Sequence, residues 1–432
     1  MEDPGPGPEP YREPDAAALV PLFSRVVLLA DGLDPLDLAG ADGFVWSSPA
    51  GTLVGTGVAA RVPVGTGPGR VERAAEAVVT LLEAAAVDAP DGGGLLPAAV
   101  GALPFHPANP GELVVPSLLL RTGPDGRTWA VLTEPGPFDP PPAADLVARL
   151  RATARHAPPW PAARRLDRDG LETWRAGVLA ALEAIGSGRL DKVVLAREAA
   201  VEADGPFPRA ELLRRLQRRP GGSTFLYASD GFVGASPELL VRRRGRVATS
   251  RPMAGTVPQG DSAGNEADGL ARLTGSLKEA VEHRLVVDAV AEALAKVADR
   301  VEVGRPEVVR LATVAHLATE ITADLTGPLP TALELAGLLH PTPAVGGSPR
   351  DAALVAIADL EPFDRGRYAG PVGWVDRAGD GEWAVALRCA ALDGRRAHLI
   401  AGAGIVPGSD PDAEWAETEH KLRAMLEVLL TP

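Results

Sequence analysis

The segment Ala401–Lys421, AGAGIVPGSDPDAEWAETEHK, constrains the fold more than any other, because a glycine-rich stretch leads directly into an acidic helix. Its glycines would let a backbone turn approach a ligand closely, since they carry no Cβ. Ser409 or Asp410 could cap the helix that follows. The N–H groups in the first turn of a helix attract a carboxylate or a phosphate. The segment therefore predicts an anion site where this turn meets the helix.

One face of this helix carries two acids and a base. Glu414, Glu417 and Lys421 stand at positions i, i+3 and i+7, so their side chains project from the same side. Two acids beside an anion require a cation, and Mg²⁺ is typically bound by one or two carboxylates together with oxygens of the ligand. The alternative is a solvated helix face stabilised by pairs of opposite charges.

The composition indicates many short elements around an aliphatic core. The 432 residues include 48 glycines and 42 prolines, which predict frequent turns. Apolar residues make up 46% of the chain and aromatic residues only 4%, so the core must consist mainly of Leu, Val and Ala. The net charge of −14 argues against a partner that is nucleic acid or an anionic membrane surface.

The cysteine content and the N-terminus bear on location. Cys389 is the single cysteine, which excludes an internal disulfide, and the chain has no Cys/His cluster typical of zinc. Residues 1–15 are acidic and rich in proline, so we expect a disordered lead without a targeting signal. No segment is long and apolar enough to span a bilayer. We therefore expect a cytoplasmic protein.

The first 160 residues are predicted to form short strands and one helix. The strands are expected at Val27–Ala30, Leu53–Val58, Ala98–Leu103 and Trp129–Leu132, and the helix at Val71–Ala86. This half shows no clear chemical motif.

A lysine stands in a predicted strand of the second half. Leu171–Ile185 has the period of a helix and is followed by the strand Leu190–Arg197, which contains Lys192. A lysine among strand-forming residues is commonly a solvated edge residue. The functional alternative is a buried base, because a secluded site favours the uncharged amine.

Glu238 follows a predicted pair of strands. The apolar runs Ser223–Ala228 and Phe232–Ala235 resemble a hairpin that ends at a Ser-Pro pair just before Glu238. A second pair is predicted at Val241–Arg244 and Arg246–Ser250. The motif PMAGT, residues 252–256, predicts a tight turn whose N–H groups could meet a ligand.

A second pair of acids stands on another predicted helix, Gly264–Arg300. Its buried stripe is expected to contain Leu270, Leu273, Leu277 and Val281. Glu279 and Glu282 share the i, i+3 spacing of the first pair of acids. The two pairs could place four carboxylates around one metal, or they could simply be solvated.

Arg388 is predicted to lie in the middle of a strand, Trp383–Ala390. A guanidinium among apolar neighbours could bind a substrate carboxylate through two parallel hydrogen bonds. A structural ion pair is the alternative.

Nine motifs in order resemble the chorismate-utilising enzymes, which include anthranilate, aminodeoxychorismate, salicylate and isochorismate synthases. They are LDKVVLAR, GASPELL, PMAGT, SLKEAVEH, HLAT, HPTPAVGG, YAGPVGW, ALRCA and the segment Ala401–Lys421. The resemblance is dense from about Leu190 to the C-terminus, within residues 160–432. Before that, only LPFHPANPGELVVPSLLL is similar to the family.

The resemblance implies an α+β fold of two packed antiparallel sheets with outer helices and a site in a cleft between the halves. We accordingly expect residues 16–432 to form a single chorismate-binding domain. We also expect a monomer whose partner is a small-molecule substrate, chorismate.

Two positions point to isochorismate synthase within this family. Members that add water carry a lysine where this chain has Lys192, and members that add ammonia lack it. Ala344 in HPTPAVGG stands where members that form an aromatic product carry threonine. A salicylate synthase, an ammonia-using anthranilate or aminodeoxychorismate synthase, and a non-catalytic relative are the alternatives.

The resemblance also implies a role for each matching residue. Lys192 would activate the water that attacks C2 of chorismate, and Glu238 would protonate the departing C4 hydroxyl. Mg²⁺ would be the cofactor, with Glu282 and Glu417 binding it directly and Glu279 and Glu414 through water. Six further residues match substrate contacts of the family, namely Gly255, Thr256, Ala344, Arg388, Gly402 and Lys421.

One motif departs from the family pattern. Relatives often have one or two arginines after the Gly-Thr pair, whereas this chain reads GTVPQG from Gly255 to Gly260. This removes positive charge near the expected pocket and bears on substrate affinity. The residues do not distinguish a product used for menaquinone from one used for a siderophore.

Overall fold

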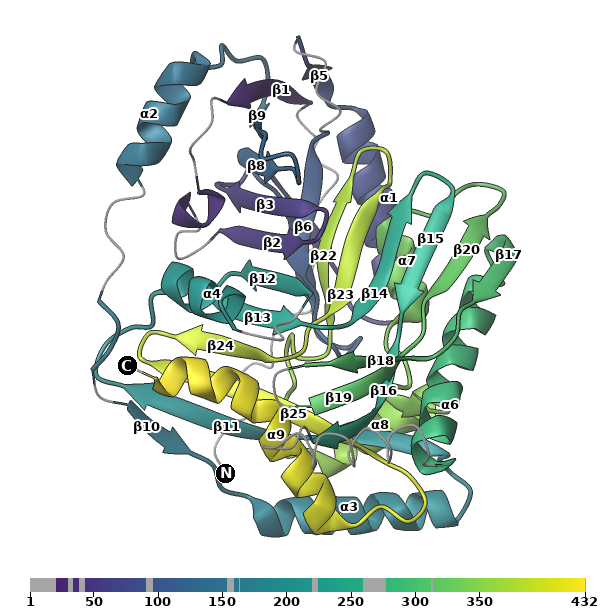
Figure 1. The fold of residues 1–432 in the computed structure, drawn as a ribbon. Helices are drawn as coiled ribbons and strands as arrows, with labels where there is room; N and C mark the ends of the chain where they lie inside the picture. The colour runs from purple at the N-terminus through teal and green to yellow at the C-terminus, as the bar shows by residue number, and fades with distance from the viewer. Residues whose placement is uncertain are drawn as a thin grey trace, which may run out of the picture.

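The computed structural model describes residues 21–29, 34–38, 43–90, 96–153, 159–162, 164–219, 224–258, 277–311 and 314–431. Two large sheets dominate it (Figure 1). In this view the strands of the first sheet cross the left side of the molecule, and those of the second run upward on the right.

Among the described residues the first sheet has 13 strands, and its order mixes early and late segments of the chain. Across the sheet the strands are β10 (Arg164–Asp167), β11 (Lys192–Ala203), β25 (Arg396–Ile405), β24 (Cys389–Asp393), β13 (Phe232–Ser236), β12 (Phe225–Ser229), β2 (Phe44–Ser48), β3 (Gly51–Thr56), β8 (Leu118–Thr122), β9 (Thr128–Pro135), β1 (Leu22–Leu29) and β5 (Ala86–Asp88). The short β21 (Gly347–Ser348) also pairs with β11. These pairs are antiparallel, except that β1 and β5 run parallel.

The second sheet has nine strands in the part of the chain that the structure describes, with a similar mixture of segments. Its order is β17 (Ala298–Val303), β20 (Ile321–Leu325), β15 (Val247–Arg251), β14 (Leu239–Arg244), β23 (Gly381–Val385), β22 (Pro371–Asp376), β6 (Ala98–Ala102), β7 (Gly111–Val115) and β4 (Ala60–Val64). A third sheet, which was not expected, consists of β16 (Met253–Pro258), β19 (Val314–Ala318) and β18 (Glu307–Arg310).

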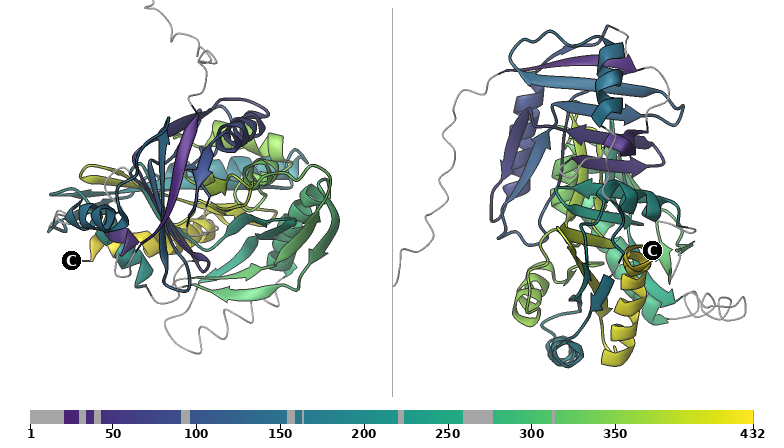
Figure 2. Two further views of the ribbon diagram at one scale, coloured as in Figure 1. Left: turned by 90° about the horizontal axis from the view of Figure 1, so that it is seen from above. Right: turned by 90° about the vertical axis from the view of Figure 1, so that its left-hand side faces the viewer.

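Helices cover the outer surfaces of the sheets (Figures 1 and 2). In chain order they are α1 (Arg70–Glu83), α2 (Ala143–Thr153), α3 (Leu171–Gly186), α4 (Arg209–Gln217), α6 (Leu277–Leu294), α7 (Ala332–Leu339), α8 (Arg350–Leu360) and α9 (Pro411–Leu430), with a 3₁₀ turn, η1, at Pro35–Leu38. Helix α9 packs on β11 and β25, and α7 packs on β14, β22 and β23. The expected α+β fold with packed antiparallel sheets and outer helices is therefore confirmed.

The core packs the two sheets together, and a buried carboxylate of one sheet is hydrogen-bonded to residues of the other. Trp46, Tyr227 and Trp383 are fully buried among aliphatic residues. Glu382 on β23 accepts hydrogen bonds from Trp46 Nε1 on β2 at 2.9 Å and from the Ser48 hydroxyl at 2.8 Å. Since a buried carboxylate is costly unless it is hydrogen-bonded, these contacts fix the two sheets relative to one another.

Most of the predicted elements are confirmed. Helices α1 and α3 and strands β1, β3, β6, β9 and β11 lie where they were expected, with ends that shift by a few residues. The hairpins β12–β13 and β14–β15 are also present. Strands β2, β4, β7 and β8 were not predicted.

Three local predictions are wrong. The motif PMAGT is a strand, β16, with a register shift between Ala254 and Thr256, so it is not a tight turn. Helix α6 ends at Leu294, because the chain continues as β17. Val281 is 64% exposed and not part of the buried stripe, which instead contains Val286 and Val290. The predicted helix residues 264–276, with Leu270 and Leu273 of the expected stripe, lie outside the described residues, and so does the side chain of Leu277.

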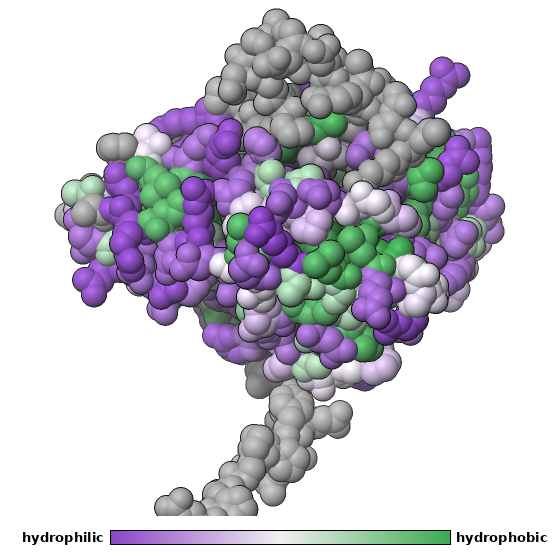
Figure 3. Space-filling model, turned by 90° about the horizontal axis from the view of Figure 1, so that it is seen from below, coloured by the Kyte–Doolittle hydropathy of each residue, from purple (hydrophilic) through white to green (hydrophobic). Residues whose placement is uncertain are grey.

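No helix in the described ranges is long and apolar enough to cross a membrane. Seen from below, the surface mixes hydrophilic residues with apolar groups (Figure 3). Helices α3 and α8, which contact each other at this end, expose Leu179 and Val355.

Candidate active site

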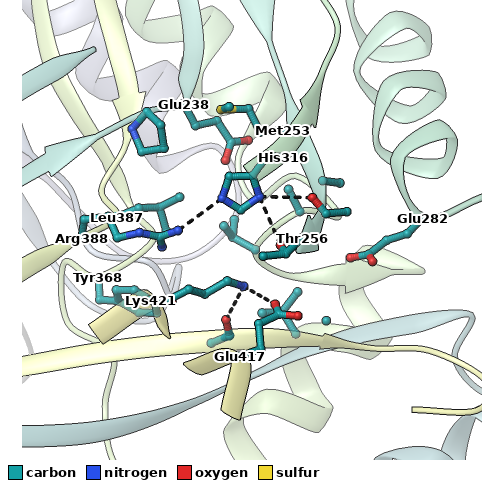
Figure 4. Close-up of a pocket in the computed structure, with 18 residues that line it drawn as sticks. Glu238, Met253, Thr256, Glu282, His316, Tyr368, Leu387, Arg388, Glu417 and Lys421 are labelled. Atoms are coloured by element: carbon teal, nitrogen blue, oxygen red, sulfur yellow. Dashed lines mark hydrogen bonds and ion pairs between the residues drawn. The ribbon is translucent and has the colours of Figure 1, made fainter. Parts of the chain in front are cut away.

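A pocket lies where the first sheet, the small third sheet and two helices meet. It is lined by residues of β11, β16, β19 and β25, by α6 and α9, and by the segments that follow α7 and precede β22 and β24. Nine of the twelve predicted site residues line it, namely Glu238, Gly255, Thr256, Glu282, Ala344, Arg388, Gly402, Glu417 and Lys421. In Figure 4 Glu238 and His316 lie above Lys421 and Glu417, with Glu282 at the right. The remaining three, Lys192, Glu279 and Glu414, are not part of this lining.

Lys192 is buried beside the pocket. It begins β11, it is 1% exposed, and its Nζ lies 2.7 Å from Oε1 of Glu282. A solvated edge position is therefore excluded, and the buried alternative is the one observed. Gly404 on β25 makes room for this pair, because a Cβ there would lie 2.7 Å from Glu282 Oε1 and 3.0 Å from Lys192 Cε.

Lys421 forms a second lysine–carboxylate pair on α9. Its Nζ lies 2.6 Å from Oε1 of Glu417 and donates to the carbonyl of Gly402 at 2.8 Å. Both partners of this pair line the pocket. The i, i+4 spacing on one helix brings the two side chains together.

The glycine-rich segment before α9 differs from the predicted turn. Gly402 and Gly404 belong to strand β25, whereas Gly408, with φ of 83°, forms the turn. Asp410 caps α9 as expected, since its carboxylate accepts from the backbone N–H of Asp412 and Ala413. These N–H groups are therefore occupied, and the pocket faces the middle of the helix. The prediction of an anion site at the start of the helix is wrong.

Glu238 is a buried carboxyl group with a raised pKa. It lies between β13 and β14 and is 3% exposed. Burial raises its pKa from 4.5 to about 7, although a backbone hydrogen bond from Met253 and the charges of Lys192, Arg388 and Lys421 act in the opposite direction. A substantial fraction of this group is therefore protonated at neutral pH.

Arg388 reaches the pocket from a bend and not from a strand. It has φ of 50° and lies between β23 and β24, so its predicted place in the middle of a strand is wrong. Its Nη2 lies 3.3 Å from Nε2 of His316 (Figure 4). Because a guanidinium can only donate, Nε2 of the histidine must accept.

His316 begins the motif HLAT, but no role was predicted for this pocket residue. It lies on β19, and burial lowers its pKa well below the usual value, with Arg388 and Lys421 adding to this effect. Its Nδ1 lies 3.2 Å from the carbonyl of Gly255, which can only accept, so Nδ1 carries the proton. The neutral ring therefore connects the bulge of β16 with Arg388. A histidine inside the buried run VAHLA was the available signal.

Glu279 supports the bulge of β16 rather than the pocket surface. Its Oε2 accepts from the backbone N–H of Thr256 at 2.9 Å. A Cβ at Gly255, which has φ of 73°, would lie 3.0 Å from the same oxygen. The N–H group of Thr256 that was expected to face a ligand is therefore bound to Glu279. Glu414 is buried, at 4% exposure.

The donor set suits a hard cation, but four acids do not gather around one point. Within the described ranges, no group of three or more His, Cys, Asp or Glu side chains is arranged to hold a metal ion. Glu282 and Glu417 nevertheless line the same pocket from α6 and α9. Two carboxylates fit Mg²⁺, which keeps several waters and takes oxygens of a substrate. Each carboxylate is paired with a lysine, so a bound ion would have to compete with Lys192 and Lys421.

Comparisons with known proteins agree with this fold and pocket. The family model described as "Chorismate binding enzyme" matches residues 31–430. Isochorismate synthase DhbC of Bacillus subtilis is 37% identical over 410 residues, which cover 89% of this chain and 93% of the relative. Isochorismate synthase EntC of Escherichia coli is 36% identical over 340 residues, covering 77% and 81%.

A solved structure shows the same architecture. MenF, the menaquinone-specific isochorismate synthase from Escherichia coli, superimposes with a TM-score of 0.75 and 27% identity over 95% of each chain. Together with the family match over residues 31–430, this shows that the chain belongs to the chorismate-binding enzymes.

Proposed function

We propose that this protein is an isochorismate synthase, which converts chorismate reversibly to isochorismate by adding water at C2 and releasing the C4 hydroxyl. The observation that carries the proposal is the pairing of a buried amine with a buried, partly protonated carboxyl group at one pocket. The names of DhbC, EntC and MenF support the choice of reaction.

Lys192 is the general base of the proposed reaction. An amine accepts a proton only when it is uncharged, so in this role Lys192, which is 1% exposed, would act as the free amine. It would remove a proton from the water that attacks C2. The contact with Glu282 holds the amine at the edge of the pocket.

Glu238 is the general acid. It lines the pocket, and its pKa of about 7 leaves a proton available near neutral pH. It would donate this proton to the C4 hydroxyl as the bond to carbon breaks, so that water leaves. General acid catalysis of this kind contributes typically about 10²–10⁴-fold to a rate.

The anionic substrate needs positive charge that the whole chain, with its net charge of −14, does not supply. Arg388 and Lys421 line the pocket and would bind the two carboxylates of chorismate. Glu282 and Glu417 would hold Mg²⁺, which when bound would supply a further positive charge for a substrate carboxylate. Ala344 lines the pocket at the position where relatives that form an aromatic product carry threonine, which supports isochorismate as the product.

The test is a product assay. Purified protein is incubated with chorismate and Mg²⁺, and the products are separated by chromatography. Isochorismate is the expected product. Salicylate without an added lyase would instead indicate a salicylate synthase, and an aminated product that requires ammonia would indicate an anthranilate or aminodeoxychorismate synthase. Unchanged chorismate would contradict every catalytic assignment.

A further inference from the structure

One edge of the strand that carries Lys192 has a gap in its pairing. Strand β11 pairs with β25 from Val193 to Glu202 along one edge. Along the other edge it pairs with β21 at residues 192–193 and with β10 at residues 200–203. Residues 194–199 therefore have no strand partner on that edge within the part of the chain that the structure describes. Their backbone groups need other partners, because unpaired buried amides are costly.

A buried ion pair supplies partners to two backbone groups in this gap, while the N–H of Val194 is bound to the carbonyl of Gly346 at 2.8 Å. Glu361, at the C-terminal end of α8, accepts from the backbone N–H of Ala196 at 2.7 Å. Arg365 donates through Nη2 to the carbonyl of Val194 at 2.7 Å. The two side chains bind each other through two hydrogen bonds, at 2.8 and 2.6 Å. Carboxylate and guanidinium thus offer an acceptor and a donor to β11, as a neighbouring strand would.

The same pair reaches two further walls of the pocket. Arg365 Nη1 donates to the carbonyl of Val345 at 2.8 Å, and the Arg365 guanidinium lies 5.9 Å from the centre of the Tyr368 ring. Val194, Val345 and Tyr368 all line the pocket. One pair of side chains therefore connects the backbone of β11, the segment next to Ala344 and the segment before β22.

Stability alone does not account for this pair. The side chains of Glu361 and Arg365 are 3% and 2% exposed. Replacement of a buried ion pair by apolar residues of similar volume is often neutral or stabilising, by roughly 1–4 kcal/mol, since two charges must otherwise be desolvated. Apolar residues could fill the same volume, but they could not make the hydrogen bonds by which the pair holds the backbone of the pocket walls.

We propose that Glu361 and Arg365 act as a positioning pair, which fixes the strand of Lys192 relative to the Val345 and Tyr368 walls and so sets the rate of turnover. This inference rests on the proposed function. Neither residue lines the pocket, so both act through the backbone that they hold. Because Arg388 and Lys421 come from other elements, substrate binding should depend on the pair less than turnover does.

The first experiment compares Glu361→Gln with Glu382→Gln. Both glutamates are 3% exposed and paired with an arginine, but Glu382 joins the two sheets away from the pocket. We expect kcat of Glu361→Gln to fall on the order of 10- to 100-fold, since small displacements of reacting groups have effects of this size. Its KM should change less than about threefold, and Glu382→Gln should keep both constants within about twofold. Equal losses in the two variants, or unchanged kcat in Glu361→Gln, would overturn the proposal.

A second variant separates positioning from folding. The double variant E361L/R365M removes both charges, so it should fold with a Tm close to that of the wild type. We expect it to retain the low kcat and to show faster amide exchange at Ala196, whose N–H loses its acceptor. Wild-type kcat in this variant would refute the positioning role. A wild-type protein that forms no isochorismate would refute the proposed function instead. Unchanged amide exchange at Ala196 in the double variant would refute the role of the positioning pair, whichever product the enzyme forms.

Discussion

At the scale of single residues, Lys192 combines burial with contact to a carboxylate of the pocket. We expect Lys192→Ala to lower kcat on the order of 10²–10⁴-fold, because the variant would lack the proposed general base. The measurement is the rate of isochorismate formation, with circular dichroism as the control for folding. Turnover like that of the wild type in a folded variant would remove the base assignment.

The pKa of Glu238 predicts a dependence of stability on pH. In the folded protein burial raises this pKa from 4.5 to about 7, whereas the unfolded chain has the lower value. Between these pH values the unfolded state binds fewer protons, so the free energy of unfolding falls as the pH rises, by up to roughly 3 kcal/mol. The glutamine in Glu238→Gln cannot ionise, so the free energy of unfolding of this variant should not show this fall as the pH rises. Urea denaturation of both proteins at acidic and at mildly alkaline pH measures the free energy of unfolding. The same change with pH in the wild type and in Glu238→Gln would contradict the raised pKa.

At the scale of elements, the close packing of β25 on β11 predicts the effect of one methyl group. A Cβ at Gly404 would lie 2.7 Å from Glu282 Oε1, so Gly404→Ala should displace the contact with Lys192. We expect kcat to fall on the order of tenfold or more, because the base would move. Gly186→Ala at the end of α3 is the matched control, since a Cβ added there would have no other atom within 4 Å. Equal activities of the two variants would show that the strand tolerates the methyl group.

At the scale of the whole molecule, the fold was easier to predict from sequence than the details of the site. Periodicity identified α3 and the hairpin β12–β13 because the backbone hydrogen bonds within a helix and within a hairpin join residues that are close in the chain. The burial of Lys192 could not be read from alternation, since β11 is covered on both faces. The positive φ of Arg388 and the contact of His316 with it depend on strands far apart in the chain. Long-range pairing therefore determines the features that local pattern missed.

Metal binding should connect elements from different parts of the molecule. Glu282 projects from α6, which packs on β16 and β17, and Glu417 projects from α9, which packs on β25 and β11. If both carboxylates bind Mg²⁺, the ion links these units in the folded chain only, so it should raise Tm. The expected gain is about 2.7 kcal/mol at a free concentration of 100 times Kd.

Glu417→Gln should abolish most of this gain, whereas Glu419→Gln on the same helix should retain it, because Glu419 pairs with Arg168 and Arg197 away from the pocket. Calorimetric titration with Mg²⁺ and thermal unfolding at rising Mg²⁺ measure binding without reference to turnover. The same titration curve for wild type and Glu417→Gln would show that the ion does not use this carboxylate. A gain in Tm that persists in both Glu282→Gln and Glu417→Gln would place the ion elsewhere, and the two lysines would then be the permanent partners of these glutamates.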